Sequence, residues 1–460
     1  MSARRRSRRV PRLAGRAAGS PGGFHPRPAT THVGTMTPDS NPHHGREFTA
    51  AWSEHMPGSM THPGPRQNTW GTPAGANHAV ADASVPIAEV LDTLWRARGV
   101  HTNPATGAPG TIPQRAIPSA GACYPVQVHL LCGTGCDVPP GIHAYNAEDS
   151  TTHRRTAAAP AMAGAILVFS VLPQRTAARY HHRALPLLLA DTAYALLGVS
   201  RHAASRGLKS RWLTADPATL AAVARLPDYA AWQGRWPDTA PELALTALAV
   251  GAGDELPSLA QWGMAAAGPA GRPQPCPQRQ PRTVASVEHW AAGPGLRHPE
   301  HAYDLTPGAV LGTVELLRRR SLPIHSPISN LAHPVRRVPW GVWRRLLGAF
   351  PLPAPAGCDV VVLGQEDIAK RGLHLECAGQ EWVHSLDGIL LLRTRAAPDE
   401  AAMWWAAGAA AHLLYSSLAT GREHTFRPVA GWTGTRDGFI TLHALGFRAQ
   451  RSEGNTHVGQ

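Results

Sequence analysis

Lysine is almost absent from this chain of 460 residues. Lys209 and Lys370 are the only lysines, so arginine supplies the other 42 of the 44 basic residues. Such a bias, together with abundant alanine and proline, is typical of a GC-rich genome. Part of the formal net charge of +13 therefore reflects codon usage. The charge indicates non-specific contact with acidic polymers at most, and we expect no specific nucleic-acid partner.

Cysteine and long apolar runs are scarce as well. The six cysteines are too few and too widely spaced for a disulfide scaffold. Cys132 and Cys136 have a spacing that resembles a metal site, but no second ligand pair completes it, and we expect no metal. No apolar run is long enough to span a membrane, and no apolar segment follows the basic N-terminus as a secretory signal requires. The sequence predicts a cytoplasmic protein without a membrane partner.

Several common cofactor and catalytic motifs are also missing. The chain has no Gly-x-Gly-x-x-Gly after a strand, no Gly-Lys-Ser/Thr loop, no His-Glu-x-x-His and no Gly-x-Ser-x-Gly elbow. Nicotinamide-, nucleotide- and zinc-dependent chemistry therefore lose support.

The two ends of the chain have the composition of disordered segments. Residues 1–70 carry scattered arginine, glycine, proline and histidine without apolar periodicity, and seven arginines fall in the first sixteen positions. We expect this segment to be disordered, with Met36 or Met60 as the true start of translation. Residues 451–460 are expected to form a short tail.

Residues 71–253 have the pattern of one α+β domain. Apolar spacing predicts a short helix from Ile87 to Arg98 and a long one from Arg183 to Arg206, which ends at Gly207 as a C-cap. Continuous apolar runs predict buried strands. These strands are expected at Val126 to Leu131, Gly141 to Tyr145, Ala165 to Val171 and Leu243 to Val250.

The same order of elements recurs after a segment rich in proline and glycine, 254–306, which we interpret as a linker. Residues 307–450 repeat the sequence of strand, helix, glycine and strand. The predicted elements are helices at Val310 to Arg320, Val342 to Leu347 and Glu400 to Thr420, the last ending at Gly421, and strands at Cys358 to Leu363, Gly388 to Arg393 and Phe439 to Leu445. We therefore expect two tandem copies of one domain, the second weaker in its motifs.

The most informative segment is Pro118-Ser119-Ala120-Gly121, which leads through Ala122-Cys123-Tyr124-Pro125 into the first strong strand. Small side chains and a glycine let the backbone approach a flat ligand closely. The segment resembles the flavin-binding loop of nitroreductase-fold enzymes, in the form found in SagB-type azoline dehydrogenases. That resemblance implies a nitroreductase-like α+β fold, FMN as the cofactor, and oxidation of thiazoline or oxazoline rings in ribosomally made peptides.

The resemblance also implies a site shared between the copies. In the fold, two subunits contribute to each flavin: one supplies the Pro-Ser loop and the other an Arg-Arg-Ser motif and a basic residue after its last strand. The first copy has the loop alone, whereas the second has Arg319-Arg320-Ser321 and Arg448 but no Pro-Ser loop near 334–340. Guanidinium groups at a helix end suit a phosphate. We expect the copies to form a pseudodimer with one composite FMN site.

Catalytic groups are expected just before the long helix. Related enzymes carry a Lys-Tyr pair there, and this chain has Arg179-Tyr180 followed by His181 and His182. Arginine is a poor proton acceptor, so Arg179 is expected to lower the pKa of Tyr180, which would act as the base, with either histidine as a substitute. Lys209 is interpreted either as a charge near the flavin ring or as a surface residue.

Three functions remain open from the sequence. The first is FMN-dependent oxidation of azolines to azoles in a precursor peptide, beside a cyclodehydratase partner and in a chain that could form a homodimer. The second is an NAD(P)H-dependent nitro or flavin reductase. The third is a flavin-free scaffold of a peptide-modifying complex, favoured by the missing lysine of the Lys-Tyr pair and the weak second copy.

Overall fold

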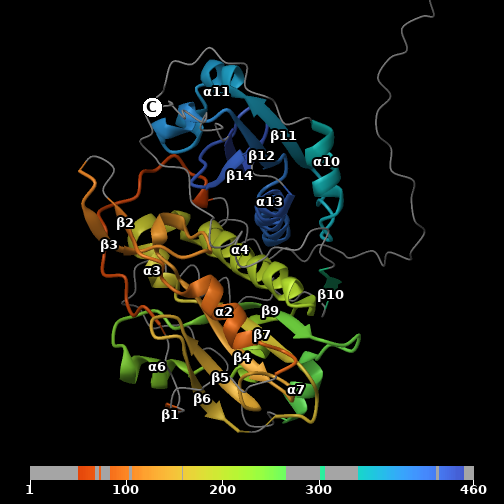
Figure 1. Cartoon of the computed structure of the whole chain (residues 1–460). Helices are drawn as coiled ribbons and strands as arrows, with labels where there is room; N and C mark the ends of the chain where they lie inside the picture. Colours follow the sequence, from red (N-terminus) through yellow and green to blue (C-terminus); the bar gives the residue numbers. More distant parts are fainter. Residues whose placement is uncertain are drawn as a thin grey trace, which may run out of the picture. The chain divides into compact units, whose positions relative to one another are not determined.

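The computed structural model describes residues 50–67, 72–73, 83–102, 106–157, 159–265, 301–305, 340–420 and 424–449, all within one compact unit (Figure 1). The predicted helix at Val310 to Arg320 and the glycine at 421 lie outside these residues. Among the described helices, none combines the length and apolar character that crossing a membrane requires.

The first copy is built on an antiparallel sheet of order β1-β6-β5-β4-β7-β9-β8-β10. Its strands are β1 (Thr72–Pro73), β4 (Val126–Cys132), β5 (Gly141–Asn146), β6 (Thr151–Thr156), β7 (Ala165–Val171), β8 (Lys209–Thr214), β9 (Leu243–Gly251) and β10 (His301–Asp304), beside a separate hairpin of β2 (Val100–Thr102) and β3 (Pro109–Pro113). Its helices are α2 (Ile87–Trp95), α3 (Pro173–Tyr180), α4 (Ala184–Ser205), α5 (Pro217–Val223), α6 (Tyr229–Arg235) and α7 (Leu259–Ala265), with short 3₁₀ turns η1 (Ala120–Ala122) and η2 (His181–Arg183).

The second copy has a smaller antiparallel sheet of order β11-β12-β14-β13. Its elements are α10 (Trp340–Gly348), β11 (Cys358–Gly364), α11 (Gln365–Arg371), α12 (Leu373–Glu376), η4 (Glu381–Ser385), β12 (Gly388–Thr394), α13 (Glu400–Thr420), β13 (His424–Val429) and β14 (Ile440–Ala449). The order matches β4-β7-β9-β8 strand for strand, and the long helix follows the second of these strands in both copies. The predicted tandem repeat is therefore present in the topology.

The central strand β7 shows why a continuous apolar run forms a strand here. Successive side chains point to opposite faces of a sheet. Leu167 and Phe169 lie in the core that contains the leucines of α4, whereas Ile166 and Val168 lie in a second core under α5 and α7. Because both faces are covered, every position of β7 is buried, as the sequence predicted, and all but Ser170 are apolar.

The two copies meet through their long helices, α4 and α13, which lie between the two sheets (Figure 1). Tyr415 donates a hydrogen bond to the carbonyl of Tyr194 at 2.9 Å, and Arg201 bonds His412 at 2.8 Å. Gly198 allows the approach, because a Cβ there would lie 2.9 Å from the hydroxyl of Tyr415. The apolar core is continuous across both copies, so the pair is packed as one body.

The predicted linker, 254–306, contains structure at both ends. The helix α7 buries Leu259 and Trp262 in the core beneath α5, and β10 pairs with β8 as an edge strand of the first sheet. The expectation of a plain linker is therefore wrong for these two segments. Two apolar side chains among prolines and glycines gave too weak a pattern to indicate a helix.

Residues 50–67 contradict the prediction that 1–70 is disordered. This N-terminal strap contacts both copies: Trp52 is buried and donates a hydrogen bond from Nε1 to the carbonyl of Thr441 at 2.8 Å. Further along, the amide of Thr61 donates to Ala178 of α3 at 2.9 Å. The strap is ordered because one large aromatic side chain and a series of backbone bonds fix it, which composition alone does not reveal.

The strap supplies a first prediction. Trp52→Phe removes the indole donor and leaves the buried Thr441 carbonyl without it, so we expect the free energy of unfolding to fall by about 1–2 kcal/mol. Met56→Ala is the matched control, because Met56 is 71% exposed and should change stability by less than about 0.5 kcal/mol. Urea unfolding of wild type and both variants measures the difference. Equal midpoints for wild type and Trp52→Phe would show that this indole hydrogen bond does not stabilise the folded chain.

Candidate functional site

The Pro-Ser-Ala-Gly segment forms a tight loop with an unusual backbone. Gly121 has φ +55°, in the left-handed region that glycine tolerates without strain. Ala122 and Tyr124 have φ +53° and +47°, a conformation that costs a non-glycine residue about 1 kcal/mol or more. Strained backbone persists only where surrounding contacts hold it in place, so the loop is held by its neighbours.

Asp191 of α4 is the anchor of this loop. Its carboxylate accepts a hydrogen bond from Ser119 Oγ at 2.6 Å and another from the amide of Ala120 at 2.9 Å. Ser119 Oγ in turn accepts one from the amide of Tyr124 at 2.9 Å. Asp191 is 4% exposed, and burial raises its pKa to about 7, although the two hydrogen bonds act in the opposite direction.

Asp191 was not among the residues chosen from the sequence. An acid inside the apolar stripe of a buried helix was the available signal, because such a residue requires a partner. The hydroxyl of Ser119, expected to face a cofactor, instead bonds Asp191 and the loop itself.

The structure brings together the two motifs identified separately in the sequence. Arg179 Nη1 donates a hydrogen bond to the carbonyl of Gly121 at 3.2 Å. A Cβ at Gly121 would lie 3.0 Å from the guanidinium of Arg179 and well inside contact distance of the hydroxyl of Tyr180. Arg175 adds a bond from Nε to the carbonyl of Cys123 at 2.7 Å. The absence of a side chain at Gly121 thus allows the end of α3 to rest directly on the loop.

The expected lowering of the Tyr180 pKa is wrong. Burial raises the pKa of Tyr180 to about 12, and the charges of Arg179 and Arg427, which lower it, do not compensate. Tyr180 is therefore a protonated phenol at neutral pH. It is suited to donate a hydrogen bond and poorly suited to remove a proton.

The two histidines of η2 differ in what they can do. His181, at φ +47°, bonds the carbonyl of Ser59 through Nε2 at 3.2 Å, so this nitrogen carries the proton. His182 bonds the backbone of His55, and its buried Nε2 has no partner among the described residues. Burial lowers the pKa of His182, with help from the charge of Arg183. A neutral imidazole with an unpaired nitrogen is the better proton acceptor of the two.

The second copy adds residues to this region. Arg427 of β13 stacks over the ring of Trp382, 4.4 Å from its centroid, and its charge acts on Tyr180. One turn beyond Tyr180, Arg183 lines a solvent-open hollow of about 380 Å³ between the strap and the second copy. Its lining also includes residues 375–376, 378–379 and 433–436. Arg427 was missed because only the fold brings its charge close enough to act on Tyr180.

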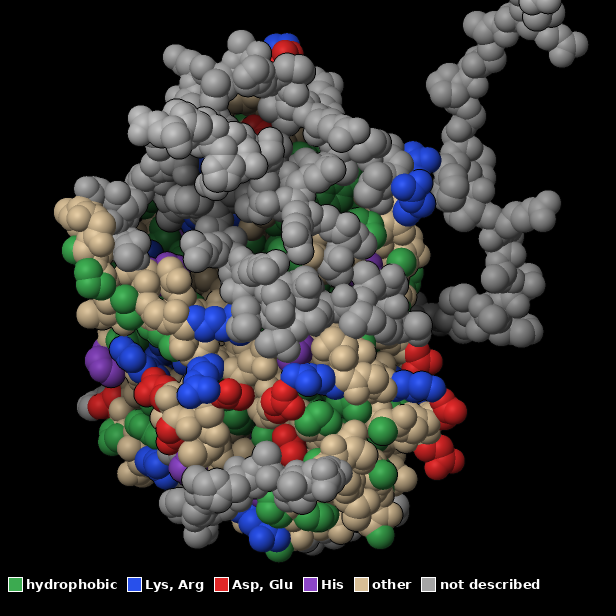
Figure 2. Space-filling view, in the orientation of Figure 1, with side chains coloured by type: hydrophobic (Ala, Val, Ile, Leu, Met, Phe, Trp, Pro, Cys, Tyr) green, Lys and Arg blue, Asp and Glu red, His purple; other side chains and the backbone are tan. Residues whose placement is uncertain are grey.

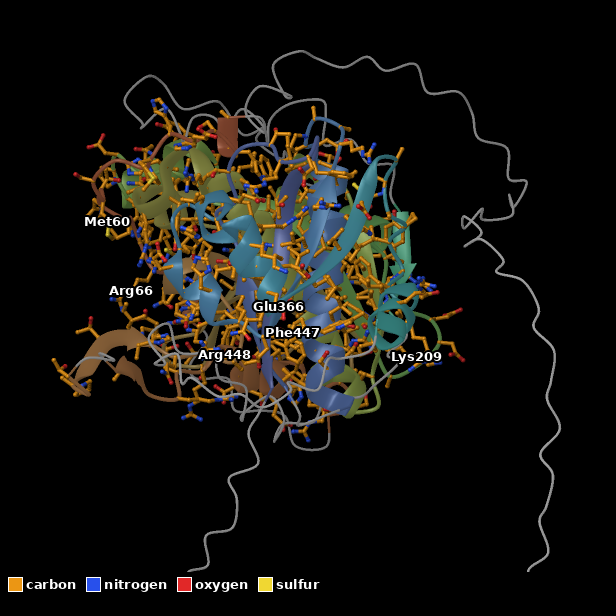
Figure 3. All side chains as sticks on the ribbon, turned by 90° about the horizontal axis from the view of Figure 1, so that it is seen from above. Met60, Arg66, Lys209, Glu366, Phe447 and Arg448 are labelled. Atoms are coloured by element: carbon orange, nitrogen blue, oxygen red, sulfur yellow. The ribbon has the colours of Figure 1, made fainter. Side chains whose placement is uncertain are left out.

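Two other predicted residues lie elsewhere. Lys209 follows the opposite end of α4, about 30 Å away by the length of that helix. Figure 3 shows it across the molecule from Met60, whose neighbour Thr61 bonds α3. Lys209 is exposed and pairs with Asp254, which agrees with the surface interpretation.

Arg448 lies within β14 rather than after the last strand, because that strand continues to Ala449. Its Nε donates to the carbonyl of Ser385 in η4. Arg319, Arg320 and Ser321 lie outside the described residues, as does most of 334–340. Of the residues predicted to bind the phosphate, Arg448 is therefore the one that lies among the described residues.

A flavin requires a hollow of suitable size and polar groups that lack protein partners. The hollow beside Arg183 has a volume in the lower part of the range of small-molecule sites. Arg183 Nε and His182 Nε2 are buried without partners among the described residues, and of the two only Arg183 lines the hollow. Arg183 and Arg436 offer positive charge to an anionic ligand, whereas Glu54 and Glu376 on the same lining oppose it. The Pro118–Gly121 loop is not part of this lining, and the hydroxyl of Ser119 is already occupied by protein contacts.

Comparison with known proteins identifies the fold. A protein described as a candidate nitroreductase from Anabaena variabilis aligns over 79% of this chain and 88% of its own, with TM-score 0.51 and 13% identity. The Escherichia coli microcin synthetase McbBCD complex with truncated pro-MccB17 bound (TM-score 0.27, 16% identity) aligns over 50% of this chain and 77% of its own. A candidate nitroreductase from Ralstonia eutropha (TM-score 0.27, 14% identity) aligns over 50% and 88%.

The sequence matches no protein-family model and no curated protein. The first alignment extends over both copies, and the chain has a nitroreductase-like α+β fold with two tandem copies, as the sequence predicted.

Proposed function

We propose that this protein is an FMN-dependent oxidoreductase that converts azoline rings of a ribosomally made peptide to azoles. The observation that carries the proposal is the contact between the Pro118–Gly121 loop and the Arg179–Tyr180 pair, two motifs 58 residues apart that meet through Gly121. The tandem nitroreductase-like fold supports it, because flavin sites in that fold lie between two subunits.

FMN, when bound, would accept the hydride from the azoline ring and later pass the electrons to oxygen. Of the chain's own groups, the loop would support the flavin ring, while Arg319, Arg320, Ser321 and Arg448 would hold the phosphate. His182 would accept the ring proton at Nε2, and Tyr180 would donate a hydrogen bond to the substrate. Arg179 and Arg427 would stabilise negative charge as it develops beside them.

The substrate and partners follow from the same proposal. A precursor peptide would arrive from a cyclodehydratase partner in the cytoplasm, and the chain could pair further as a homodimer. On the coloured part of the face in Figure 2, Lys and Arg side chains are interspersed with Asp and Glu. An acidic peptide would therefore meet local charges on this face and not an unbroken basic patch.

The absorption spectrum of the purified protein tests the proposal. We expect flavin bands with one flavin per chain, and their loss when Arg319→Ala and Arg320→Ala are combined. Arg344→Ala with Arg345→Ala is the matched control, because this exposed pair on α10 repeats the charge change away from the site. A colourless wild type would favour the flavin-free scaffold. A double variant that stays as yellow as wild type would refute the composite site.

The nitro or flavin reductase remains the second enzyme candidate. It is distinguished by adding NAD(P)H alone under anaerobic conditions. Bleaching of the bound flavin would favour the reductase, whereas a dehydrogenase should be reduced by its azoline substrate instead.

A further inference from the structure

Two histidines and a glutamate converge on the surface of the second copy. His374 belongs to α12, and Glu381 and His384 belong to η4, which follows a short loop. One ligand atom from each lies within 4.8 Å of the others. The side chains of His374 and His384 are 21% and 26% exposed, so solvent and ions can reach them.

The distances between these groups resemble those of a coordination site. A carboxylate oxygen of Glu381 lies 3.7 Å from Nε2 of His374, and its other oxygen lies 3.9 Å from Nε2 of His384. Both separations exceed a good hydrogen bond. Ligand atoms around a tetrahedral Zn²⁺ with bonds near 2.0–2.1 Å are about 3.3 Å apart. His374 faces Glu381 with Nε2 and His384 with Nδ1, so an adjustment of its ring and of the carboxylate would let all three groups share one ion.

The two imidazoles already approach each other closely. Nε2 of His384 and Nδ1 of His374 are hydrogen-bonded at 2.6 Å, and the ring centroids are 4.3 Å apart. In this hydrogen bond one ring nitrogen donates and the other accepts. A divalent cation would replace this bond and gain the nearby carboxylate as a third ligand.

We propose that His374, Glu381 and His384 form a binding site for a divalent metal ion of the Zn²⁺ class, with water in the fourth position. Two histidines and a glutamate with one open position form an established zinc ligand set. The site is independent of the flavin loop and of the proposed oxidation.

The ion would act as a clamp within the second copy. It would join α12 to η4, and both segments support neighbouring structure: the carbonyl of Ser385 accepts a bond from Arg448, and that of Glu376 accepts one from Thr433 at 2.8 Å. Thr433 also lines the hollow beside Arg183. Metal binding is thus expected to stabilise the folded chain.

Titration of the metal-stripped full chain with Zn²⁺ and with Co²⁺ tests the site. We expect wild type to bind one more equivalent of Zn²⁺ than His374→Ala or His384→Ala, and to gain a few degrees in melting temperature that the variants do not gain. Co²⁺ should produce the visible absorption of a four-coordinate ion in wild type alone. The control His101→Ala removes an exposed histidine outside the cluster and should behave as wild type.

Glu381→Gln tests the site with a change that is not expected to disturb folding, because this side chain is 79% exposed. It should weaken Zn²⁺ binding by about tenfold or more while leaving the circular dichroism spectrum unchanged. Equal Zn²⁺ stoichiometry and affinity in wild type and all three variants would overturn the proposal.

Discussion

Gly121→Ala is expected to abolish most turnover and to reduce the flavin content of the purified protein. The new Cβ would collide with the hydroxyl of Tyr180 and press on the guanidinium of Arg179, in a residue at φ +55°. The loop and α3 would have to separate. A shift of about 1 Å in a positioned group can cost roughly 100-fold in rate. Steady-state kinetics and the flavin-to-protein absorbance ratio measure the two effects.

Gly207→Ala is the matched control for the cost of placing alanine at a positive φ angle. Gly207 has φ +73°, but nothing lies within 4 Å of a Cβ there. It should therefore cost about 1 kcal/mol of stability through its backbone alone, with no loss of flavin.

Combining Gly121→Ala with Tyr180→Phe removes the hydroxyl that the new methyl group meets. The pair should recover flavin content and stability relative to Gly121→Ala, although not turnover. If the double variant recovers neither, the close approach of α3 to the loop does not set the geometry of this site.

Asp191→Asn is expected to remove a large part of the pH dependence of stability. Because the folded-state pKa is raised to about 7, the stabilising contribution of the protonated carboxyl is complete below about pH 4 and is lost as pH rises through 7. From pH 5 to pH 8, wild type should lose about 3 kcal/mol relative to Asp191→Asn. Urea unfolding of both proteins at the two pH values measures this difference.

The same comparison with Asp149→Asn shows whether the pH dependence of stability is specific to Asp191 or follows from the loss of any carboxylate. Asp149 is exposed, so this variant should follow wild type at both pH values. Parallel stability curves for wild type and Asp191→Asn would mean that another group is responsible for the pH dependence. They would also weaken the assignment of Asp191 as the anchor of the loop.

Local pattern was sufficient to predict the elements with strong apolar signals. The strand at Ala165–Val171 and the helix at Glu400–Thr420 have the predicted bounds, because the interior of each is buried on all sides and mostly apolar. The tandem repeat was visible for the same reason. Less apolar strands, such as β6 and β13, were missed, since polar side chains at half-buried positions carry a weak period.

The site was predicted only where its residues belong to a local motif. Pro118–Gly121 and Arg179–Tyr180 each stand out in the sequence, but their contact depends on the packing of α3 against the loop. The roles of Asp191 and Arg427 arise from burial and from pairing between distant segments. The pKa of Tyr180 was misjudged because desolvation, which no sequence motif encodes, outweighs a neighbouring charge.

Oxidation of an azoline-containing peptide is the most direct test of the proposed dehydrogenase activity. The peptide is incubated in air with the yellow protein and analysed by mass spectrometry. We expect the peptide to lose two hydrogen atoms per ring, with no NAD(P)H required and with the rate greatly reduced in Gly121→Ala. An unchanged peptide mass with flavin-loaded wild type, together with bleaching by NAD(P)H alone, would contradict it.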